Sequence, residues 1–129
     1  MLDTNIISDL IKNPGGLAAR RVQAVGEAIV VTSVIVAAEL RYGCARKGSP
    51  PLLKRVEALL AEMPVLALDV PTDTAYGAIR AELEAGGQTI GHNDLFIAAH
   101  ASALGATLVT ANEREFRRIR GLNVENWLA

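Results

Sequence analysis

Hydrophobic and polar positions follow two different periods along the chain, and each change of period marks an expected element. Short apolar or β-branched runs at 28–33, 65–70 and 106–110 predict buried strands. A very short first strand is expected at Met1-Leu2, and a last one around "LNVENW" near the C-terminus. Between these runs, apolar residues recur every three or four positions, which is the period of an amphipathic helix.

Turn and capping residues set the expected ends of the helices. The helical segments are "NIISDLIK", "GGLAARRVQAVG", "VIVAAELRYGCARK", "PPLLKRVEALLAEM", "PTDTAYGAIRAELEAGG", "GHNDLFIAAHASALG" and "NEREFRRIR". Small polar residues before a helix accept hydrogen bonds from its first N–H groups, and glycine after it adopts the left-handed conformation of a helix stop. The residues expected in these roles are Ser33, Gly48, Thr72 or Asp73, Asn93 or Asp94, and Gly105.

Alternating strands and helices in a chain of 129 residues predict an α/β fold. We expect a three-layer α/β/α arrangement in which helices flank a mostly parallel central sheet, within a single domain over residues 1–129. In such sheets, ligands bind beyond the carboxyl ends of the strands. That edge is where functional residues are expected.

Composition narrows the class of protein. The longest apolar stretch, 28–40, contains Thr32 and Ser33 and is too short to span a bilayer. Asp3 and Asp9 fall where a signal peptide would be basic or apolar, so the cytoplasm is the expected location and no membrane partner is expected. A single cysteine excludes an internal disulfide and a thiolate metal site.

Three acidic residues are notable for their places in the predicted elements. Asp3 follows the first strand and Asp94 opens an apolar helix, so each can be explained as a helix N-cap. Glu39 lies inside a helix, on the same face as apolar residues three and four positions away. A surface edge or a salt bridge to an arginine is the alternative explanation for Glu39, because an isolated buried carboxylate costs several kcal/mol.

These acids can converge at one edge of a parallel sheet, since two of them fall at or near strand ends and the third lies on a helix that follows another strand. Carboxylates packed together repel one another and need a compensating cation. Oxygen ligands without sulfur favour Mg²⁺ or Mn²⁺ over zinc. An ion of this kind can activate water and neutralise the charge that develops on a phosphodiester, so the pattern indicates phosphodiester hydrolysis.

The motif Asp3-Thr4-Asn5, Glu39 in "AAELRYG" and Asp94 in "GHNDLFIAAHA" resemble the PIN-domain ribonucleases, and most closely the VapC toxins of bacterial toxin–antitoxin pairs. The likeness extends to "LGATLVTANEREFRRIRGLNVENW" and therefore covers nearly the whole chain. The resemblance implies a PIN-like fold and a Mg²⁺-dependent endoribonuclease, with Mn²⁺ as a substitute ion. It also implies that Asp3, Glu39 and Asp94 bind the metal and carry catalysis.

Two positions depart from the family pattern. Many PIN proteins have a further acid just after the fourth strand, and the matching position here is Asn112, next to Thr110. Asn112 is an expected site residue that can accept a hydrogen bond or ligate a metal through its carbonyl. Because it brings no charge, the number of metal ions at the site, one or two, stays open. Family members also have a few more residues before the first Asp. Either the first strand is clipped to Met1-Leu2 or the true start lies upstream.

The resemblance implies further contacts and partners. A small VapB antitoxin is expected to wrap the toxin and cover the acidic pocket, often with a basic side chain that reaches in. A homodimer, a larger toxin–antitoxin assembly and contact with operator DNA only through the antitoxin are also expected. The substrates are structured RNAs such as tRNA or rRNA. The expected substrate contacts are Thr4, Asn5, Thr110 and the arginines of one predicted helical face, Arg114, Arg117 and Arg118.

Two rival functions remain at the level of sequence. A haloacid-dehalogenase-like phosphatase also places an Asp after its first strand, but it needs a second Asp two residues later, where this chain has Asn5. A catalytically inactive PIN-like module that only binds other proteins is favoured by the uncharged Asn112. The presence of all three acids argues for the enzyme.

Overall fold

The central sheet is made of short parallel segments, and the chain start lies in its middle. The computed structural model describes residues 1–129. Its strands are β1 (Thr32–Ser33), β2 (Val65–Leu66), β3 (Leu108–Val109) and β4 (Val124–Glu125). β1 pairs with β2, β3 pairs with β4, and Leu2 forms parallel bridges to both Thr32 and Val109. The order across the sheet is therefore β2-β1-Leu2-β3-β4.

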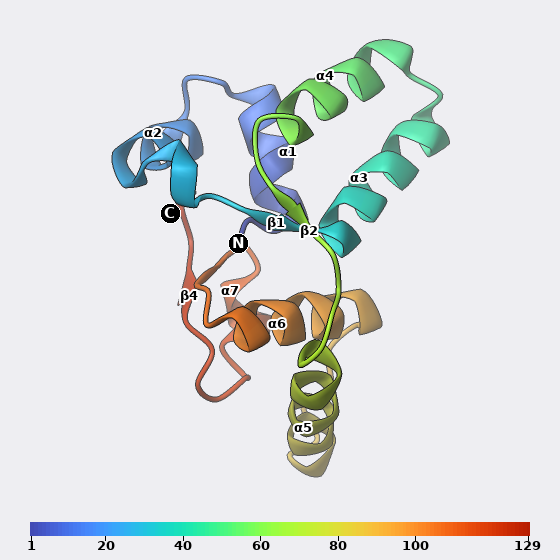
Figure 1. Ribbon diagram of the computed structural model, residues 1–129, viewed down its shortest axis with the longest axis vertical. Coiled ribbons are helices and arrows are strands. Elements are labelled where there is room, and N and C mark those ends of the chain that lie inside the picture. The colour runs from blue at the N-terminus through green and yellow to red at the C-terminus, as the bar shows by residue number, and fades with distance from the viewer.

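Helices lie on both sides of this sheet, as the alternation of strands and helices predicts. They are α1 (Thr4–Lys12), α2 (Leu17–Val25), the 3₁₀ turn η1 (Glu27–Ile29), α3 (Val34–Lys47), α4 (Pro50–Leu60), α5 (Thr72–Ala85), α6 (His92–Leu104) and α7 (Glu113–Phe116). Figure 1 shows α1 to α4 on one side of β1 and β2, and α5 and α6 on the other. None of the helices combines the length and the hydropathy that a bilayer crossing requires.

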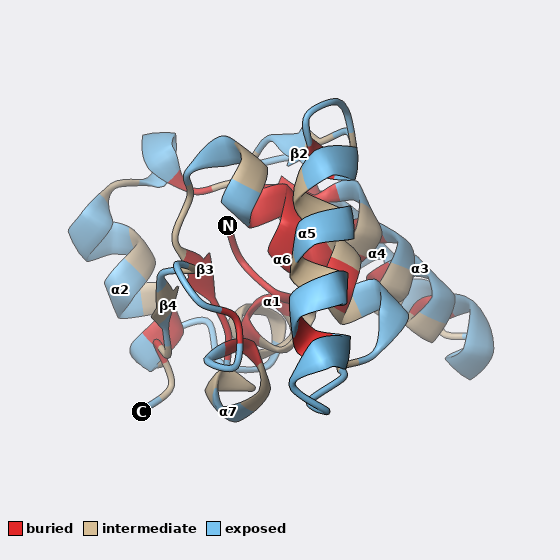
Figure 2. Ribbon diagram, turned by 90° about the horizontal axis from the view of Figure 1, so that it is seen from below, coloured by how far each residue is buried: buried red, intermediate tan, exposed pale blue.

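The hydrophobic core joins the sheet to both groups of helices. Twenty-two buried residues form one cluster, which includes Ile6 and Ile7 of α1, Ile97 of α6, Leu108 of β3 and Phe116 of α7. Figure 2 shows buried residues at β3 and along α6, while the outer turns of α2, α3 and α5 are exposed. Burying one large apolar side chain stabilises a fold by about 1.5–3 kcal/mol, so this core holds the sheet and both groups of helices together.

Several predicted caps are confirmed. Ser33 precedes α3, and its Oγ accepts a hydrogen bond from the N–H of Ile35 at 3.1 Å. Gly48 and Gly105 follow α3 and α6 with φ values of 62° and 64°, in the left-handed region that favours glycine. Asp3 precedes α1 in an extended conformation, and its Oδ1 accepts a hydrogen bond from the N–H of Thr4 at 2.8 Å. Asp3 therefore does cap a helix.

The strands are shorter than predicted. The predicted strand 28–33 begins with the η1 turn, where Ile29 is 71% exposed, and only its last two residues pair. Of the predicted strand 65–70, only Val65–Leu66 pairs, because β2 is an edge strand whose one neighbour, β1, is itself two residues long. The strands predicted at 106–110 and near "LNVENW" likewise shrink to β3 and β4. Apolar β-branched character therefore indicates neither strand length nor burial reliably in these runs, since Ile29, Val65 and Val70 are exposed.

Two predicted helix caps are wrong. Neither Thr72 nor Asp73 caps α5, since the helix starts after Pro71 and the N–H of Thr72 donates to the backbone carbonyl of Asp69 at 2.9 Å. Neither Asn93 nor Asp94 caps α6, because that helix already begins at His92, after Gly91. The carboxylate of Asp94 lies in the first turn and is not used for capping.

Ser33 links the cap of α3 to a buried histidine on the other side of the sheet. Nδ1 of His100, which is 1% exposed, lies 2.8 Å from Ser33 Oγ. We expect Ser33→Ala to lower the free energy of unfolding by about 2 kcal/mol, because it removes a cap and leaves a buried imidazole nitrogen without its partner. Ser49→Ala, which removes only the α4 cap bond to Leu52, serves as the control and should cost about 1 kcal/mol. Urea denaturation measures both, and equal losses would contradict this role of the histidine contact.

Candidate active site

Asp3 is a buried carboxylate surrounded by neutral hydrogen-bond donors. It is 4% exposed, at the carboxyl end of the central segment of the sheet. Its Oδ2 accepts a hydrogen bond from Thr110 Oγ1 at 2.8 Å and a longer one from Asn5 Nδ2 at 3.4 Å. Burial raises the pKa of Asp3, the hydrogen bonds lower it in part, and repulsion by Glu39 raises it further. No lysine or arginine pairs with it.

Thr110 and Asn5 hold Asp3 in place. The N–H of Asn112 donates to Thr110 Oγ1 at 3.0 Å, and the N–H of Ala111 donates to Asn5 Oδ1 at 2.9 Å. These bonds tie the start of α1 to the chain after β3. Thr110 is fully buried and positions Asp3 through its hydrogen bond to Oδ2, and its contact with substrate stays a prediction.

Glu39 lies on α3, half-buried, and reaches the same region through a single hydrogen bond. Thr4 Oγ1 donates to Glu39 Oε1 at 2.7 Å. The alternative explanation by a salt bridge is wrong, because no cation pairs with Glu39 and the nearby Arg41 pairs with Glu57 instead, at 3.4 Å. Thr4 therefore links two of the acids: its N–H donates to Asp3, and its hydroxyl donates to Glu39.

Asp94 has neither an ion pair nor a hydrogen bond to compensate its charge. Partial burial raises its pKa to about 6, with added repulsion from Asp3, Glu39 and Glu115. This coupling shows that residues from α1, α3, α6 and α7 place their carboxylates close together. The three acids that the sequence singled out therefore lie in one cluster, together with a fourth.

Glu115 is the member of the cluster that sequence reasoning missed. Asn112 Nδ2 donates to Glu115 Oε2 at 3.1 Å, so Asn112 orients this carboxylate. The available signal was the spacing: Asn112 immediately precedes α7, and Glu115 follows three residues later, as in a capping box. A negative charge is thus present near the position where the family pattern places an acid, although it comes from a different residue.

The predicted arginine face does not form. The helix expected over "NEREFRRIR" is only the four residues of α7, so Arg117 and Arg118 lie beyond its end. Arg117 pairs with Glu113 at 3.5 Å, and Arg118 donates to the carbonyl of Thr89 at 3.2 Å. Only Arg114 of the three stays exposed without a partner. A buried Phe116 at the end of α7 explains the short helix, because it anchors the chain before the turn into β4.

The donor set of the cluster suits a hard divalent cation. It consists of carboxylate oxygens, it contains no sulfur or imidazole, and none of the five ion pairs of the molecule involves it. The side chains do not by themselves form a closed cage of three or more ligands. Asp94 is the member with the most freedom to reorient, since no hydrogen bond holds it.

Comparisons with known proteins agree with this geometry. The PIN domain profile matches residues 1–122. The chain is 38% identical to Ribonuclease VapC2 of Rickettsia felis and 38% identical to the tRNA(fMet)-specific endonuclease VapC of Shigella flexneri, in both cases over 98% of this chain and 96% of the relative.

Solved structures show the same likeness. The DNA-bound VapBC2 structure of Rickettsia felis aligns with a TM-score of 0.91 at 35% identity, over 98% of this chain and 97% of that one. The DNA-bound VapBC structure of Salmonella typhimurium aligns with a TM-score of 0.90 at 36% identity, over 98% and 96% of the two chains. The protein therefore belongs to the PIN-domain family and, within it, to the VapC group.

Proposed function

We propose that this protein is an endoribonuclease, the toxin of a VapBC toxin–antitoxin pair, and that it hydrolyses phosphodiester bonds in structured RNA. The observation that carries this proposal is the cluster of uncompensated carboxylates at the strand ends of a chain 38% identical, over 98% of its length, to a protein named Ribonuclease VapC2. Its place of action would be the cytoplasm, where RNA is available.

In this proposal Asp3, Glu39 and Asp94 hold Mg²⁺, or Mn²⁺ in its place. When bound, the ion lowers the pKa of a water molecule and neutralises charge on the phosphate. Asp3 is held rigidly by Thr110, whereas Asp94 is free to turn toward the ion and the substrate. Asp3 is thus a preorganised ligand, whereas Asp94 has to reorient when the ion binds.

Glu115 gives the site a fourth carboxylate, and we include it in the acidic machinery. Asn112 then acts through Glu115, which it holds by the hydrogen bond from its side-chain amide. This arrangement weakens the argument that an uncharged Asn112 makes the protein an inactive binding module. The match to the PIN domain profile also removes the phosphatase alternative, because it identifies a different family.

The first RNA to test is initiator tRNA. Relatives from Shigella flexneri and Salmonella typhimurium, 38% and 36% identical to this chain, are named tRNA(fMet)-specific endonuclease VapC. Ribosomal RNA is the second class to test, because the residues around the carboxylates do not distinguish between structured RNAs.

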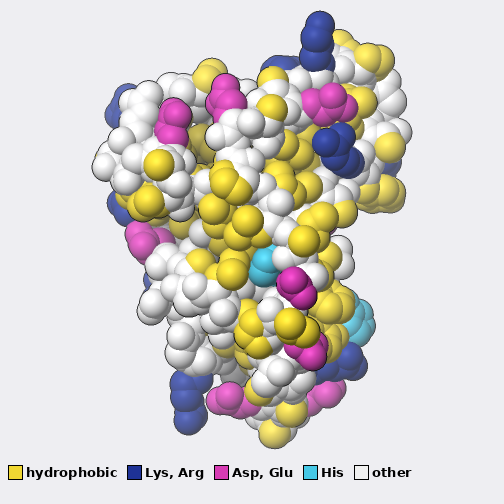
Figure 3. Space-filling model, viewed as in Figure 1, with side chains coloured by type: hydrophobic (Ala, Val, Ile, Leu, Met, Phe, Trp, Pro, Cys, Tyr) yellow, Lys and Arg dark blue, Asp and Glu magenta, His cyan; other side chains and the backbone are white.

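A VapB antitoxin is the proposed protein partner, and a homodimer is the proposed state of the toxin. Three solved structures similar to this chain are titled as VapBC complexes, two of them with DNA. Figure 3 shows hydrophobic side chains spread over the face where β1, β2 and the segment toward α5 run. Val34, Val65 and Val70 remain 41%, 38% and 75% exposed, and apolar surface of this kind marks an association site. Operator DNA would be contacted only through the antitoxin.

Removing one acid should abolish RNA cleavage. We expect Asp3→Ala and Asp94→Asn to lower the rate of tRNA(fMet) cleavage by at least about 100-fold, and EDTA to do the same to the unaltered protein. Asp73→Asn, which changes an exposed acid in the first turn of α5, is the matched control and should leave the rate unchanged. Cleavage at discrete sites that persists in EDTA and in Asp3→Ala would refute the metal mechanism. No cleavage of any RNA in a total RNA pool would favour the binding module.

Asp94→Asn should stabilise the metal-free protein at neutral pH. The folded-state pKa of Asp94, about 6, lies above the ordinary value of 3.8, so the protonated group favours the folded state and stability is lost as pH rises between these values. At a pH of about 7.5 we expect a gain of about 1–2 kcal/mol from the substitution, after allowance for solvent screening, and most of it should vanish at a pH of about 4. Urea denaturation in EDTA measures this difference. Added Mg²⁺ should stabilise the unaltered protein more than the variant, and a pH-independent effect would be contrary to the proposal.

The role of Glu115 can be separated from that of its neighbour. In metal-free protein, Glu115→Gln should lower the pKa of Asp94 below about 6, because it removes one of the repelling charges. Glu113→Gln should not, since Glu113 is paired with Arg117. NMR titration of the Asp94 carboxyl group measures its pKa in both variants. We also expect Glu115→Gln to weaken activity about 10- to 100-fold, and unchanged values in both assays would remove Glu115 from the site.

A further inference from the structure

A groove that carries several charged side chains lies between α1, α3 and α4 and reaches the carboxylate cluster at Glu39. Its volume is about 470 Å³, and Thr4 and Glu39 form part of its lining. The groove therefore includes one of the proposed catalytic acids, Glu39, and the residue next to Asp3. Its size lies within the range of about 300–1,000 Å³ that is typical of ligand sites.

Three cations from three different helices converge on this groove. Lys12 is in the last turn of α1, Lys47 is in the last turn of α3, and Arg55 lies within α4. All three are exposed, and none takes part in an ion pair. The helix dipole favours a lysine near a helix C-terminus, which accounts for Lys12 and Lys47 separately. It does not explain why all three cations face one groove.

We propose that this groove binds the phosphodiester backbone of the RNA substrate next to the bond that is cut, with Lys12, Lys47 and Arg55 in contact with phosphates. The inference rests on the proposed ribonuclease function. Like charges that converge on one groove repel each other, and bound phosphates relieve this repulsion. Ser8, which also lines the groove, adds a hydroxyl that can donate to a phosphate or a ribose oxygen.

RNA needs such a site because the catalytic acids alone repel it. Four carboxylates without a paired cation lie where a phosphate has to approach. Cations beside the cluster hold the flanking phosphates and offset this repulsion, as in other sites that follow a nucleic-acid backbone. Of the three arginines after β3, Arg117 and Arg118 are engaged within the protein, which leaves only Arg114 free for this purpose there.

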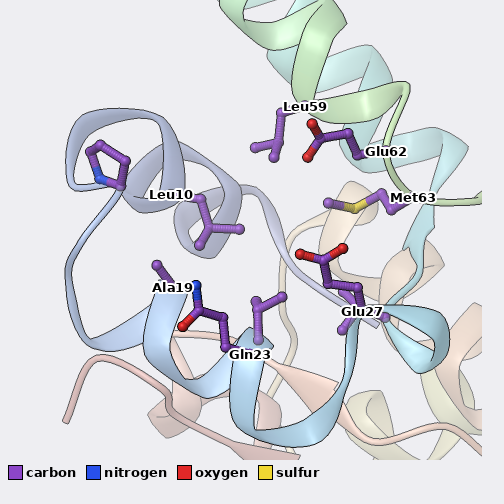
Figure 4. A pocket seen from close by; sticks show the side chains of 10 residues that line it. Leu10, Ala19, Gln23, Glu27, Leu59, Glu62 and Met63 are labelled. Atoms are coloured by element: carbon purple, nitrogen blue, oxygen red, sulfur yellow. The ribbon is translucent and has the colours of Figure 1, made fainter.

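The composition of the groove favours RNA over a protein ligand. Figure 4 shows a second groove, between α1, α2 and α4, lined by Leu10, Leu59 and Met63 together with Glu27 and Glu62. That groove carries two glutamates and no cation. In the groove beside Glu39 the charge is of the opposite sign, because three cations and only one carboxylate, Glu39, line it. A polyanion therefore fits the groove beside Glu39, and an apolar or basic peptide fits the groove of Figure 4.

Neighbouring cations provide matched controls for a binding test. Lys47→Gln is compared with Arg46→Gln, and Arg55→Gln with Lys54→Gln, since each control removes the same charge one residue away and outside the groove. All variants carry Asp94→Asn to prevent cleavage, and their affinity for labelled tRNA(fMet) is measured between about 50 and 200 mM salt. Because all four side chains are exposed, equal thermal unfolding is expected and confirms that the variants are folded.

We expect each groove variant to bind tRNA(fMet) up to about fivefold more weakly and to reduce the slope of log affinity against log salt by about 0.7–0.9. The controls should change neither quantity. Equal losses in groove variants and controls would overturn the proposal, because they would indicate diffuse attraction. Unchanged RNA binding with weaker VapB binding would also overturn it and would assign the groove to an acidic protein segment.

The proposal for the groove and the proposed nuclease function can be tested separately. In the cleavage-competent background, Lys47→Gln and Arg55→Gln should raise KM for RNA with kcat unchanged, as expected for lost uniform binding. If the unaltered protein cleaves no RNA while the groove variants still lose tRNA affinity relative to their controls, the nuclease function is wrong and the RNA site stands. If cleavage occurs and KM is unaffected, the groove proposal is wrong and the nuclease stands.

Discussion

The structure depends on keeping several carboxylates close together without a cation of the protein's own. Asp3 is buried among neutral donors, Glu39 receives one hydroxyl, and Asp94 receives no hydrogen bond at all. Such an arrangement costs free energy in the metal-free protein, because burial and mutual repulsion both oppose ionisation. The remaining contacts of the site limit this cost while leaving the oxygens available to a ligand.

The sheet makes this arrangement possible. Leu2 bridges to strands on both sides, so Asp3, the next residue, emerges at the centre of the edge where parallel strands end. α3 begins directly after β1 and carries Glu39 to the same edge, and the segment after β3 returns Thr110 to Asp3. The strands need only two paired residues each, because the core on both sides fixes their direction.

The net charge of the chain is only −1, but its acidic and basic side chains gather at different places on the surface. The acids gather at the strand ends, where the ion is proposed to bind. Unpaired cations line the adjacent groove between α1, α3 and α4. A second groove, with two glutamates and no cation, is lined by other residues of α1 and α4. One small chain thus presents separate surfaces suited to a metal ion, to a polyanion and to a protein partner.

The sequence determined the fold class, most helices and the three acids, because hydrophobic period, glycine stops and carboxylates at element ends are local signals. It did not determine the strand lengths, since pairing depends on neighbours distant in the chain. It also did not determine the start of α6, which places Asp94 inside the first turn and leaves its carboxylate free of a capping role. Only the tertiary structure brought Glu115 to the cluster, joined Thr110 to Asp3 and engaged Arg117 and Arg118. Those outcomes depend on which side chains meet across the fold, and a single chain's pattern does not contain that information.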